Sequence, residues 1–560
     1  MKKGQIIEGT VREISFPNVG LVETEEGPVN VKNVLPGQTI SCRITKKGHG
    51  RAKGQLLSVE KRSSEEMESP CSHFDQVTGC GGCLYQTLPY EKQLAIKEDQ
   101  VKKLLFDGEN DVSRSMEDVV YDGISPSPEQ FGFRNKMEFS FGDEFKDGPL
   151  ALGMHKRGSF YDVITTDHCQ IVDEDYRLIL RTVLDFAAEN HMTYFHRSRL
   201  KGFFRHLLVR KAKGTGEILV GIVTSSEGPG ISAKENTTAV AGLSAGQDEA
   251  NGPSLTANGK KTADQLMEEL TEKLAQLPAE CHTESRAENT QHDEKKQDGR
   301  TAENGYEKWH VENKLTGRIV GIVHIINDSI ADIVRADEMR ILFGKDYFYE
   351  KMLGLSFKVT PFSFFQTNTK GAEVLYQIVR DYCVTCVDQK GSGQSDLGSD
   401  SAKPRTETTL PDKKPTIFDL YSGTGTIAQV LAPIAEKVVG VEIVEEAVVA
   451  ARENAALNGL DNCEFLAGDV LKVIDSIQDK PDLIVVDPPR DGIHPKALPK
   501  ILDFGVDHII YISCKPSSLA RDLEIIEQAG YRMEKYAMVD LYPGTIHVET
   551  VVLLNRTLAR

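Results

Sequence analysis

The sequence predicts an α/β protein with a small N-terminal β-barrel, a central α+β region and a doubly wound C-terminal sheet. Three observations predict this arrangement. Short alternating strands fill the N-terminal region, strand patterns rich in basic residues occupy the middle, and buried strands alternate with helices from Thr416 onward. The last pattern is typical of a parallel sheet covered by helices. We therefore expect three domains, at 1–62, 63–375 and 376–560.

The length and composition fit a globular chain of several domains. A chain of 560 residues that is 39% hydrophobic can bury a core in each of about three domains. The N-terminus lacks the apolar segment of a signal peptide, and no apolar run reaches the ~20 residues of a membrane helix. Ten cysteines without a secretion signal do not suggest a disulfide framework. We expect a cytoplasmic monomer that contacts no membrane.

Residues 1–62 alternate apolar and polar residues in short runs separated by Gly, Pro and Asn. Such runs are typical of a small OB-fold barrel. The formal net charge of the chain is −18, yet this region holds eleven Lys and Arg against six Asp and Glu. A local basic surface can bind phosphate whatever the total charge. The favoured interpretation is a loop that faces RNA, and the alternative is a solvated hairpin; its basic residues are Arg43, Lys46, Lys47, Arg51 and Lys53.

Four cysteines are candidate metal ligands. Cys71, Cys80 and Cys83 lie close together among glycines, and Cys169 follows in DHCQI. Structural zinc usually binds two Cys-x2-Cys pairs or a nearby His pair, whereas this sequence has one such pair, an offset cysteine and a remote one. The pattern favours an iron–sulfur cluster over zinc, and cysteines without any metal are the remaining alternative. His73 is a candidate zinc ligand, although we expect it to form a hydrogen bond within its loop.

The central region predicts an antiparallel sheet, with strand patterns in 131–142, 151–172 and 203–224. Its basic side chains fit either a solvated strand face or an RNA channel, and their positions alone do not decide between the two. They are Arg134, Lys136, His155, Lys156, Arg157, Arg205 and Arg210. Polar segments at about 225–261, 279–312 and 387–414 are too poor in apolar residues to fold, and residues 262–277 between the first two predict a helix.

The C-terminal region reads as a Rossmann-like sheet. Ile417–Ala432 predicts a buried strand, a tight glycine turn and a helix, and the next strand ends at Glu442, 17 residues after Gly425. Later strands end at polar or reactive residues, namely Asp469, Asp487, Cys514 and, at the start of the last strand, Glu549. The pyrophosphate fingerprint Gly-x-Gly-x-x-Gly is missing, so we interpret the fold as one for S-adenosylmethionine rather than NAD. A turn without any ligand is the alternative.

Taken together, these motifs show that the sequence resembles the RNA uracil-5 methyltransferases of the 23S ribosomal RNA type, which carry a TRAM domain and a [4Fe–4S] cluster. The resemblance covers nearly all of the chain outside the polar segments. Its motifs are CGGC with two outlying cysteines, FGFRNK, FSFFQTN, DLYSGTGT, DPPRDG, SCKPSSLARDL and PGTIHVE. Two departures stand out: the longer spacing between Cys71 and Cys80, and Lys515 where Asn is common after the nucleophile.

The resemblance implies methyl transfer from S-adenosylmethionine to carbon 5 of a uridine in RNA. Cys514 maps onto the nucleophile that adds to carbon 6 of uracil, and Glu549 onto the base that removes the carbon-5 proton. The alternatives are a buried strand-end thiol and a solvated strand acid. His547 is assigned to packing or substrate contact, and Asp469 to the adenine edge. The residues that map onto cofactor contacts are Gln366, Tyr421, Gly423, Glu442 and Asp487.

Within the family, the barrel and the cysteines favour 23S ribosomal RNA as the substrate, with transfer RNA as the alternative. A DNA or protein amino-methyltransferase would need no cysteine, and DPPR followed by SCKP argues against one. From a different class, an RNA-binding iron–sulfur sensor without catalysis is the competing hypothesis. The presence of both Cys514 and Glu549 argues against that sensor.

Overall fold

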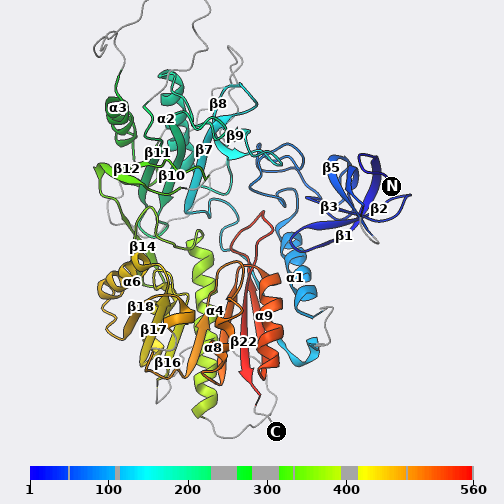
Figure 1. Cartoon of the computed structure of the whole chain (residues 1–560), viewed down its shortest axis with the longest axis vertical. Coiled ribbons are helices and arrows are strands. Elements are labelled where there is room, and N and C mark those ends of the chain that lie inside the picture. The colour runs from blue at the N-terminus through cyan, green and yellow to red at the C-terminus, as the bar shows by residue number, and fades with distance from the viewer. Residues whose placement is uncertain are drawn as a thin grey trace, which may run out of the picture.

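The computed structural model describes residues 1–47, 51–106, 114–228, 261–279, 314–331, 334–391, 414–473 and 477–557. The described residues form three sheet-based regions (Figure 1). The barrel lies to one side, the central sheet stands at one end of the long axis, and the C-terminal sheet stands at the other. The expected mixed α/β architecture is therefore confirmed.

The N-terminal barrel closes with the strand order β1-β2-β3-β5-β4. Its inward residues are aliphatic and nearly fully buried, Val22, Val29, Val31 and Ile40 among them, because successive side chains of a strand point to opposite faces. The predicted small barrel is thus present. Its strands are β1 (Ile6–Ser15), β2 (Val19–Glu23), β3 (Val29–Lys32), β4 (Thr39–Lys46) and β5 (Ala52–Lys61).

The central sheet has the order β13-β12-β11-β10-β7-β8-β9, and all of its neighbouring strands are antiparallel except β11 and β12. The strands are β7 (Lys136–Asp143), β8 (Leu150–His155), β9 (Val163–Thr165), β10 (Phe204–Lys211), β11 (Glu217–Thr224), β12 (Arg318–Ile326) and β13 (Glu338–Gly344). Helices α2 (Glu174–Glu189) and α3 (Ala263–Ala275) share its hydrophobic core. The helix predicted within 262–277 is confirmed as α3, whose start is fixed by a capping box between Thr262 and Gln265.

The C-terminal sheet has the order β18-β17-β16-β19-β20-β22-β21-β6. The strands from β18 to β20 are mutually parallel, whereas β22 is antiparallel to both of its neighbours. The strands are β16 (Thr416–Leu420), β17 (Lys437–Glu442), β18 (Cys463–Ala467), β19 (Leu483–Val486), β20 (His508–Ser513), β21 (Tyr531–Val539), β22 (Glu549–Arg556) and β6 (Val120–Ser125).

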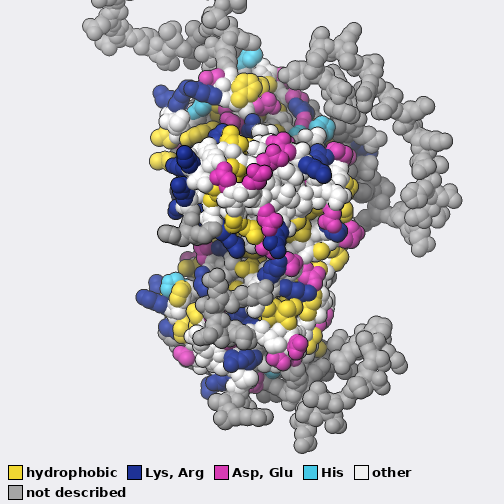
Figure 2. All heavy atoms as spheres, turned by 90° about the vertical axis from the view of Figure 1, so that its right-hand side faces the viewer, with side chains coloured by type: hydrophobic (Ala, Val, Ile, Leu, Met, Phe, Trp, Pro, Cys, Tyr) yellow, Lys and Arg dark blue, Asp and Glu magenta, His cyan; other side chains and the backbone are white. Residues whose placement is uncertain are grey.

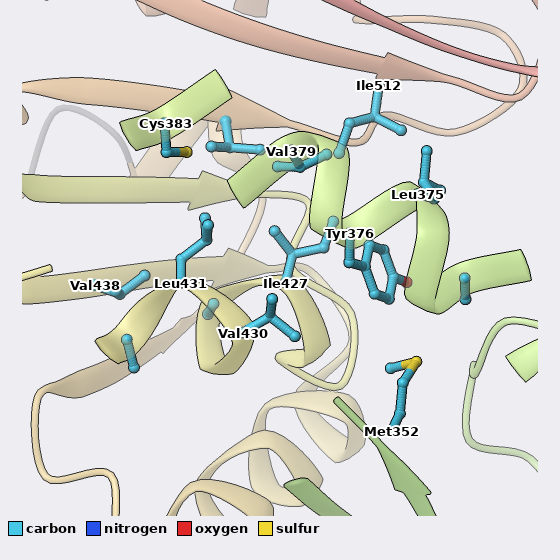
Figure 3. Close-up of a cluster of buried hydrophobic side chains, with 14 of the residues drawn as sticks. Met352, Leu375, Tyr376, Val379, Cys383, Ile427, Val430, Leu431, Val438 and Ile512 are labelled. Carbon is cyan, nitrogen blue, oxygen red and sulfur yellow. The ribbon is translucent and has the colours of Figure 1, made fainter. Parts of the chain in front are cut away.

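Helices cover both faces of this sheet. Ile417 packs with one helical layer and Phe418 with the other, as the alternation of a strand requires. The first layer holds α4 (Thr369–Gly391), α5 (Thr426–Leu431) and α6 (Glu445–Leu457). Figure 3 shows Tyr376 and Val379 of α4 facing Ile427 of α5. The second layer holds α1 (Tyr90–Phe106), α8 (Ala497–Leu502) and α9 (Pro516–Gln528). The short elements are α7 (Val470–Val473), η1 (Met116–Asp118), η3 (Ala432–Ile434) and the β14 (Phe348–Met352)–β15 (Leu355–Val359) hairpin.

Two elements lie where the sequence boundaries did not place them. β6 pairs with β21 and α1 packs against α9, so both join the C-terminal sheet although they precede the central strands in the chain. Helix α4 continues to Gly391, beyond the expected start of the third polar segment. The remainder of the three segments expected to be disordered lies almost entirely outside the described residues. Among the described helices, none is long and apolar enough to cross a membrane.

On the face seen in Figure 2, Lys and Arg side chains gather along the left edge of the upper half. Over the rest of this face, basic, acidic and apolar side chains are interspersed.

Candidate active site

One large cavity, of about 1710 Å³, lies between the carboxyl ends of the C-terminal strands and the loops of the central region. Every candidate site residue of the sequence lines it. These residues are Cys71, Cys80, Cys83, Cys169, Gln366, Tyr421, Gly423, Glu442, Asp487, Cys514 and Glu549. The convergence of Tyr421, Gly423, Glu442, Asp487 and Cys514 follows from the parallel strands, whose carboxyl ends all meet at the same edge of the sheet.

The turn after β16 is tightly constrained. Tyr421, with φ of 68°, and Gly425, with φ of 73°, both adopt left-handed backbone conformations. A Cβ on Gly425 would stand 2.6 Å from the Phe465 ring, so only glycine fits between β16 and α5. A non-glycine residue with positive φ is costly and is retained mainly where the site demands it. The turn therefore holds the backbone of Tyr421 and Gly423 at the cavity wall.

The side chains of Glu442 and Asp419 hold this turn and the start of α5 through hydrogen bonds to the backbone. Glu442 at the end of β17 accepts the N–H of Gly423 at 3.0 Å and that of Val444 at 2.9 Å. Asp419 in β16 is fully buried and accepts the N–H of Ala428 in the first turn of α5 at 2.9 Å. Burial, together with the nearby Asp487, raises the pKa of Asp419 to about 7. The acid predicted after the glycine turn thus lies against the turn itself.

Cys514 and Glu549 come from neighbouring antiparallel strands. Cys514 follows β20 and Glu549 begins β22, whose register pairs Ser513 with Thr550. The next step of that register sets Cys514 opposite Glu549, a position in which side chains of adjacent strands are in reach of each other. Asp487 follows β19, the strand on the other side of β20. A thiol and two carboxyl groups therefore share one end of the cavity.

The electrostatics of this group are set by burial and by mutual repulsion. Burial raises the pKa of Glu549 to about 8, with a contribution from Asp487. Burial raises the pKa of Cys514 to about 12, and the charges of Glu549 and Asp487 add to the effect. Arg490 lowers the pKa of both groups. Glu549 can therefore exchange a proton near neutral pH, whereas the Cys514 thiol holds its proton until a neighbouring group accepts it.

Arg490, the last residue of the DPPR motif, is a functional residue that the sequence reasoning did not single out. Its guanidinium lies 3.1 Å from Nδ1 of His547. Since a guanidinium only donates, His547 accepts at Nδ1, and its remaining proton lies on Nε2. Burial and the nearby Arg490 lower the pKa of His547 to about 4, so the ring is neutral at physiological pH. The only sequence signal was the position of Arg490 directly after a strand-end acid.

Two sequence motifs meet behind the cavity. Asn135 of FGFRNK donates to the carbonyl of Gln366 and to the hydroxyl of Thr369, both at 2.8 Å. The Gln366 side chain in turn forms a hydrogen bond with the hydroxyl of Tyr376, which is otherwise buried on α4. The role of Tyr376 was hidden in the sequence, because its spacing is that of any core residue of a helix.

Two basic residues of the central sheet are buried rather than exposed. Arg210 is 1% exposed and donates to the carbonyls of Thr360, Pro361 and Ser363, which shape the chain leading to Gln366. Arg205 is 3% exposed and donates to the carbonyls of Asn327, Ser329 and Ala331. Neither guanidinium lies on a solvated face, because each satisfies unpaired loop carbonyls, and for Arg210 the RNA channel is wrong as well. Arg134 does line the cavity.

The four cysteines converge at the other end of the cavity. Burial raises the pKa of Cys83 to about 12, and the charges of Cys169, Cys80 and Cys71 add to this effect. Burial likewise raises the pKa of Cys169 to about 11. Arg157 donates to the carbonyls of Cys80 and Cys83 and joins their loop to β8. The remote cysteine thus lies beside the three local ones, as the sequence pattern anticipated.

Within the described residues, no three His, Cys, Asp or Glu side chains are arranged around a single metal ion position. His73 accepts the N–H of His168 at 3.0 Å, and burial lowers its pKa to about 4. The hydrogen-bonding role expected for His73 is therefore present. This arrangement does not show an iron–sulfur centre.

Comparison with known proteins identifies the family. The profile of the tRNA (uracil-5-)-methyltransferase family matches residues 406–557. An RNA methyltransferase of Clostridium tetani is 39% identical over 99% of both chains, and one of Caldanaerobacter subterraneus subsp. tengcongensis is 38% identical over the full length of both. The chain belongs to the RNA uracil-5 methyltransferase family. The resemblance to the RNA uracil-5 methyltransferases is thereby confirmed at the level of the family, and the chain is an RNA-modifying enzyme.

A solved member of the RNA uracil-5 methyltransferases shares the fold. The tRNA (uracil-54, C5)-methyltransferase of Pyrococcus abyssi, in complex with S-adenosyl-L-homocysteine, aligns with a TM-score of 0.63 at 21% identity. The alignment covers 98% of this chain and 100% of that chain. Both chains therefore share one overall architecture, from the barrel to the C-terminal sheet.

Proposed function

We propose that this enzyme transfers a methyl group from S-adenosylmethionine to carbon 5 of a uridine in 23S ribosomal RNA. The observation that carries the proposal is the position of Cys514 opposite Glu549 on adjacent strands. Both residues line the same cavity as the glycine turn that the Glu442 carboxylate contacts. This combination fits the chemistry of uracil, because carbon 5 becomes nucleophilic only after a thiolate has added to carbon 6.

The residues around the glycine turn fit S-adenosylmethionine. The turn leaves the backbone of Gly423 open to the cavity, since a Cβ there would find only the Phe364 ring, at 3.8 Å. The carboxylate of Glu442 would accept the two ribose hydroxyls, and Asp469 lines the cavity where the adenine would lie. Gln366, held by Asn135 and Tyr376, would contact the methionine portion. When bound, the cofactor supplies an electrophilic methyl group.

Cys514 and Glu549 divide the remaining chemistry between them. The Cys514 sulfur adds to carbon 6 of uracil while the thiol proton passes to a carboxylate at the same end of the cavity, and the electron pair of the carbon 5–carbon 6 double bond moves into an enolate. After carbon 5 has been methylated, Glu549 removes the carbon-5 proton, the carbon 5–carbon 6 double bond re-forms and the sulfur leaves. A carboxyl group with a pKa near 8 is well matched to a proton transfer at neutral pH. Asp487 lies between the cofactor turn and the substrate end of the cavity.

We further propose that Cys71, Cys80, Cys83 and Cys169 hold a [4Fe–4S] cluster. The four thiolates of such a cluster bind four different irons, so they need not stand as close together as the ligands of a single ion. The convergence of one remote and three local thiols supports this assignment over zinc. We assign the cluster a structural role, because Leu84 and Tyr85, which follow Cys83, donate their N–H groups to the carbonyl of Gly544 in the segment before Glu549.

The N-terminal barrel is assigned to RNA binding as a TRAM domain, and we expect the enzyme to act in the cytoplasm as a monomer. Arg43, Lys46 and Lys53 lie where the C-terminal part of β4 pairs with the start of β5. Transfer RNA is the second candidate substrate, because the similar Pyrococcus abyssi enzyme is named for tRNA uracil 54.

Nucleoside mass spectrometry of 23S ribosomal RNA and transfer RNA, with and without the gene, tests the function and the substrate together. We expect 5-methyluridine to disappear from the ribosomal fraction alone. Its loss from transfer RNA alone would keep the chemistry and reverse the substrate assignment. Unchanged levels in both fractions would favour a catalytically silent RNA-binding sensor.

A further inference from the structure

A second cavity, of about 300 Å³, lies in the central region, and its wall shares no residue with the large cavity. Strand β7 connects the two. Met137 near its start lines the large cavity, and Phe141 near its end lines the second one. Four strand residues rise roughly 13 Å, which sets the separation of these two lining residues along the strand.

One wall of the second cavity is the hairpin 156–162, between β8 and β9. Phe160 and Tyr161 lie at its tip, where they are 78% and 68% exposed. Exposed aromatic side chains placed side by side at a cavity mouth mark a binding surface more often than a structural need. Nothing about the packing of the central sheet requires them, since its core is closed by Phe139, Phe141 and Phe204 below.

Hydrogen bonds hold the backbone of the hairpin. Lys156 donates its N–H to the carbonyl of Asp162 at 2.9 Å, and the hydroxyl of Ser159 accepts the N–H groups of Tyr161 and Asp162. At its base, the N–H of Arg157 donates to the carbonyl of Gly79 at 2.8 Å. The backbone of the hairpin is thus attached to the loop that carries Cys80, so only the two side chains remain to be ordered when a ligand binds.

The segment 194–199 adds further rings to the lining of the cavity. The rings of Tyr194 and His196 lie 4.1 Å apart, and the guanidinium of Arg205 lies 4.1 Å above the ring of Phe195. Lys146, Arg197 and Arg199 add positive charge at exposed positions of the wall. Its acids largely offset that charge, so stacking rather than phosphate attraction must dominate any affinity. The acids are Asp143, Asp147 and Asp162.

We propose that this second cavity is a stacking site for an unpaired base of the RNA substrate, away from the uridine that is methylated. The aromatic rings that line this cavity suit a planar base, and every base offers a flat face to such rings. The inference rests on the proposed action on RNA, and it assigns the enzyme a second point of contact with the strand that carries the target.

Fluorescence anisotropy with a short labelled oligouridylate, using the full-length protein, tests the site. Changing both rings, Phe160→Ala with Tyr161→Ala, should raise the Kd about tenfold or more, while the slope of log Kd against log salt stays unchanged. Replacement of both rings by Trp should keep the Kd within about twofold, because stacking is retained. The matched control is Phe343→Ala, a partly exposed phenylalanine on β13 at the far edge of the same sheet, which should bind as the unmodified protein does.

Photo-crosslinking with oligouridylate that carries 4-thiouridine gives a second readout, in which peptides containing 156–162 should be attached to RNA. An unchanged Kd in the double alanine variant, crosslinks at the large cavity alone, or no binding of the RNA by the unmodified protein would each overturn the stacking site. Failure of the proposed reaction is distinguishable, because it would appear as missing 5-methyluridine in an assay of the unmodified enzyme.

Discussion

At the scale of single residues, the proposed division of labour between Cys514 and Glu549 makes a direct prediction. Glu549→Gln keeps the shape of the side chain but cannot accept the carbon-5 proton, so the sulfur cannot leave. We expect this variant to accumulate a covalent protein–RNA complex, seen as a slower band in a denaturing gel with labelled RNA and S-adenosylmethionine.

The matched controls for this experiment are other cysteine variants. Cys514→Ala combined with Glu549→Gln should abolish the band, whereas Cys463→Ala with Glu549→Gln should retain it, since Cys463 starts β18 and does not line the cavity. A band that persists without Cys514 would assign the nucleophile to another residue.

The pH dependence of the reaction should report the environment of Glu549. Because burial and Asp487 raise its pKa to about 8, the basic form increases as the pH rises, and kcat/KM should rise between pH 6 and 9. Arg490 lowers the pKa of Glu549, so Arg490→Gln should shift this rise toward higher pH. The control is Arg532→Gln, on exposed β21 surface away from the cavity, with an unchanged profile. A rise centred at the same pH in both variants would contradict the assignment.

Residue by residue, the sequence could predict those side chains whose position follows from strand ends. Glu442, Asp487 and Cys514 each follow or end a parallel strand, and the topology alone brings them to one edge. It could not predict Tyr376, because only the tertiary arrangement shows that the hydroxyl of a core tyrosine meets Gln366. Arg210 was misread for a similar reason, since a strand pattern does not reveal which loop carbonyls lie above it.

At the scale of elements, helix α1 was the least predictable part of the site. Its Lys97 is fully buried and forms an ion pair of 2.7 Å with Asp540, and Lys97 also donates to the carbonyl of Tyr542. These contacts hold the segment 540–548, which leads from β21 to Glu549. No periodicity in α1 signals such a contact, because a lysine in a helix is expected on the solvated face rather than in the core.

Removing one partner of this pair should be costly. Lys97→Met leaves the Asp540 carboxylate buried without its cation, and we expect a loss of about 3–5 kcal/mol, measured by urea unfolding. Lys97→Met with Asp540→Asn removes that charge and should recover most of the stability, but not the methylation rate, because the bond to Tyr542 is still missing. The control Lys103→Met breaks an exposed pair with Asp99 on the same helix and should cost at most about 0.5 kcal/mol. Equal losses of stability in Lys97→Met and Lys103→Met would contradict the role of Lys97 in holding the segment 540–548.

At the scale of the whole molecule, the segment that carries Cys71, Cys80 and Cys83 joins all three regions. The side-chain amide of Gln38 in the barrel donates a hydrogen bond of 2.8 Å to that of Gln76. The backbone of Cys80 forms an isolated β-bridge with that of Lys156, beside the central sheet. The N–H groups of Leu84 and Tyr85 both donate to the carbonyl of Gly544 in the segment before Glu549. A cluster held by the four cysteines would therefore tie the barrel, the central sheet and the catalytic segment through one short stretch of chain.

If the proposed cluster is present, removal of iron should loosen the junction and leave the sheets intact. Cys169 would no longer be linked to the three local cysteines, and the loop between them would regain its freedom. We expect hydrogen exchange of the full-length protein, before and after chelation under reducing conditions, to become faster in 540–548 and 156–162. The amides of β16 and β19 in the sheet centre should exchange as before, because helices cover both of their faces. The variant Cys463→Ala serves as the control that keeps the cluster, and it should match the untreated protein in every segment. Equal protection of 540–548 with and without iron would show that Leu84, Tyr85 and Lys97 hold the catalytic segment on their own, and would restrict the cluster to the cysteine loops.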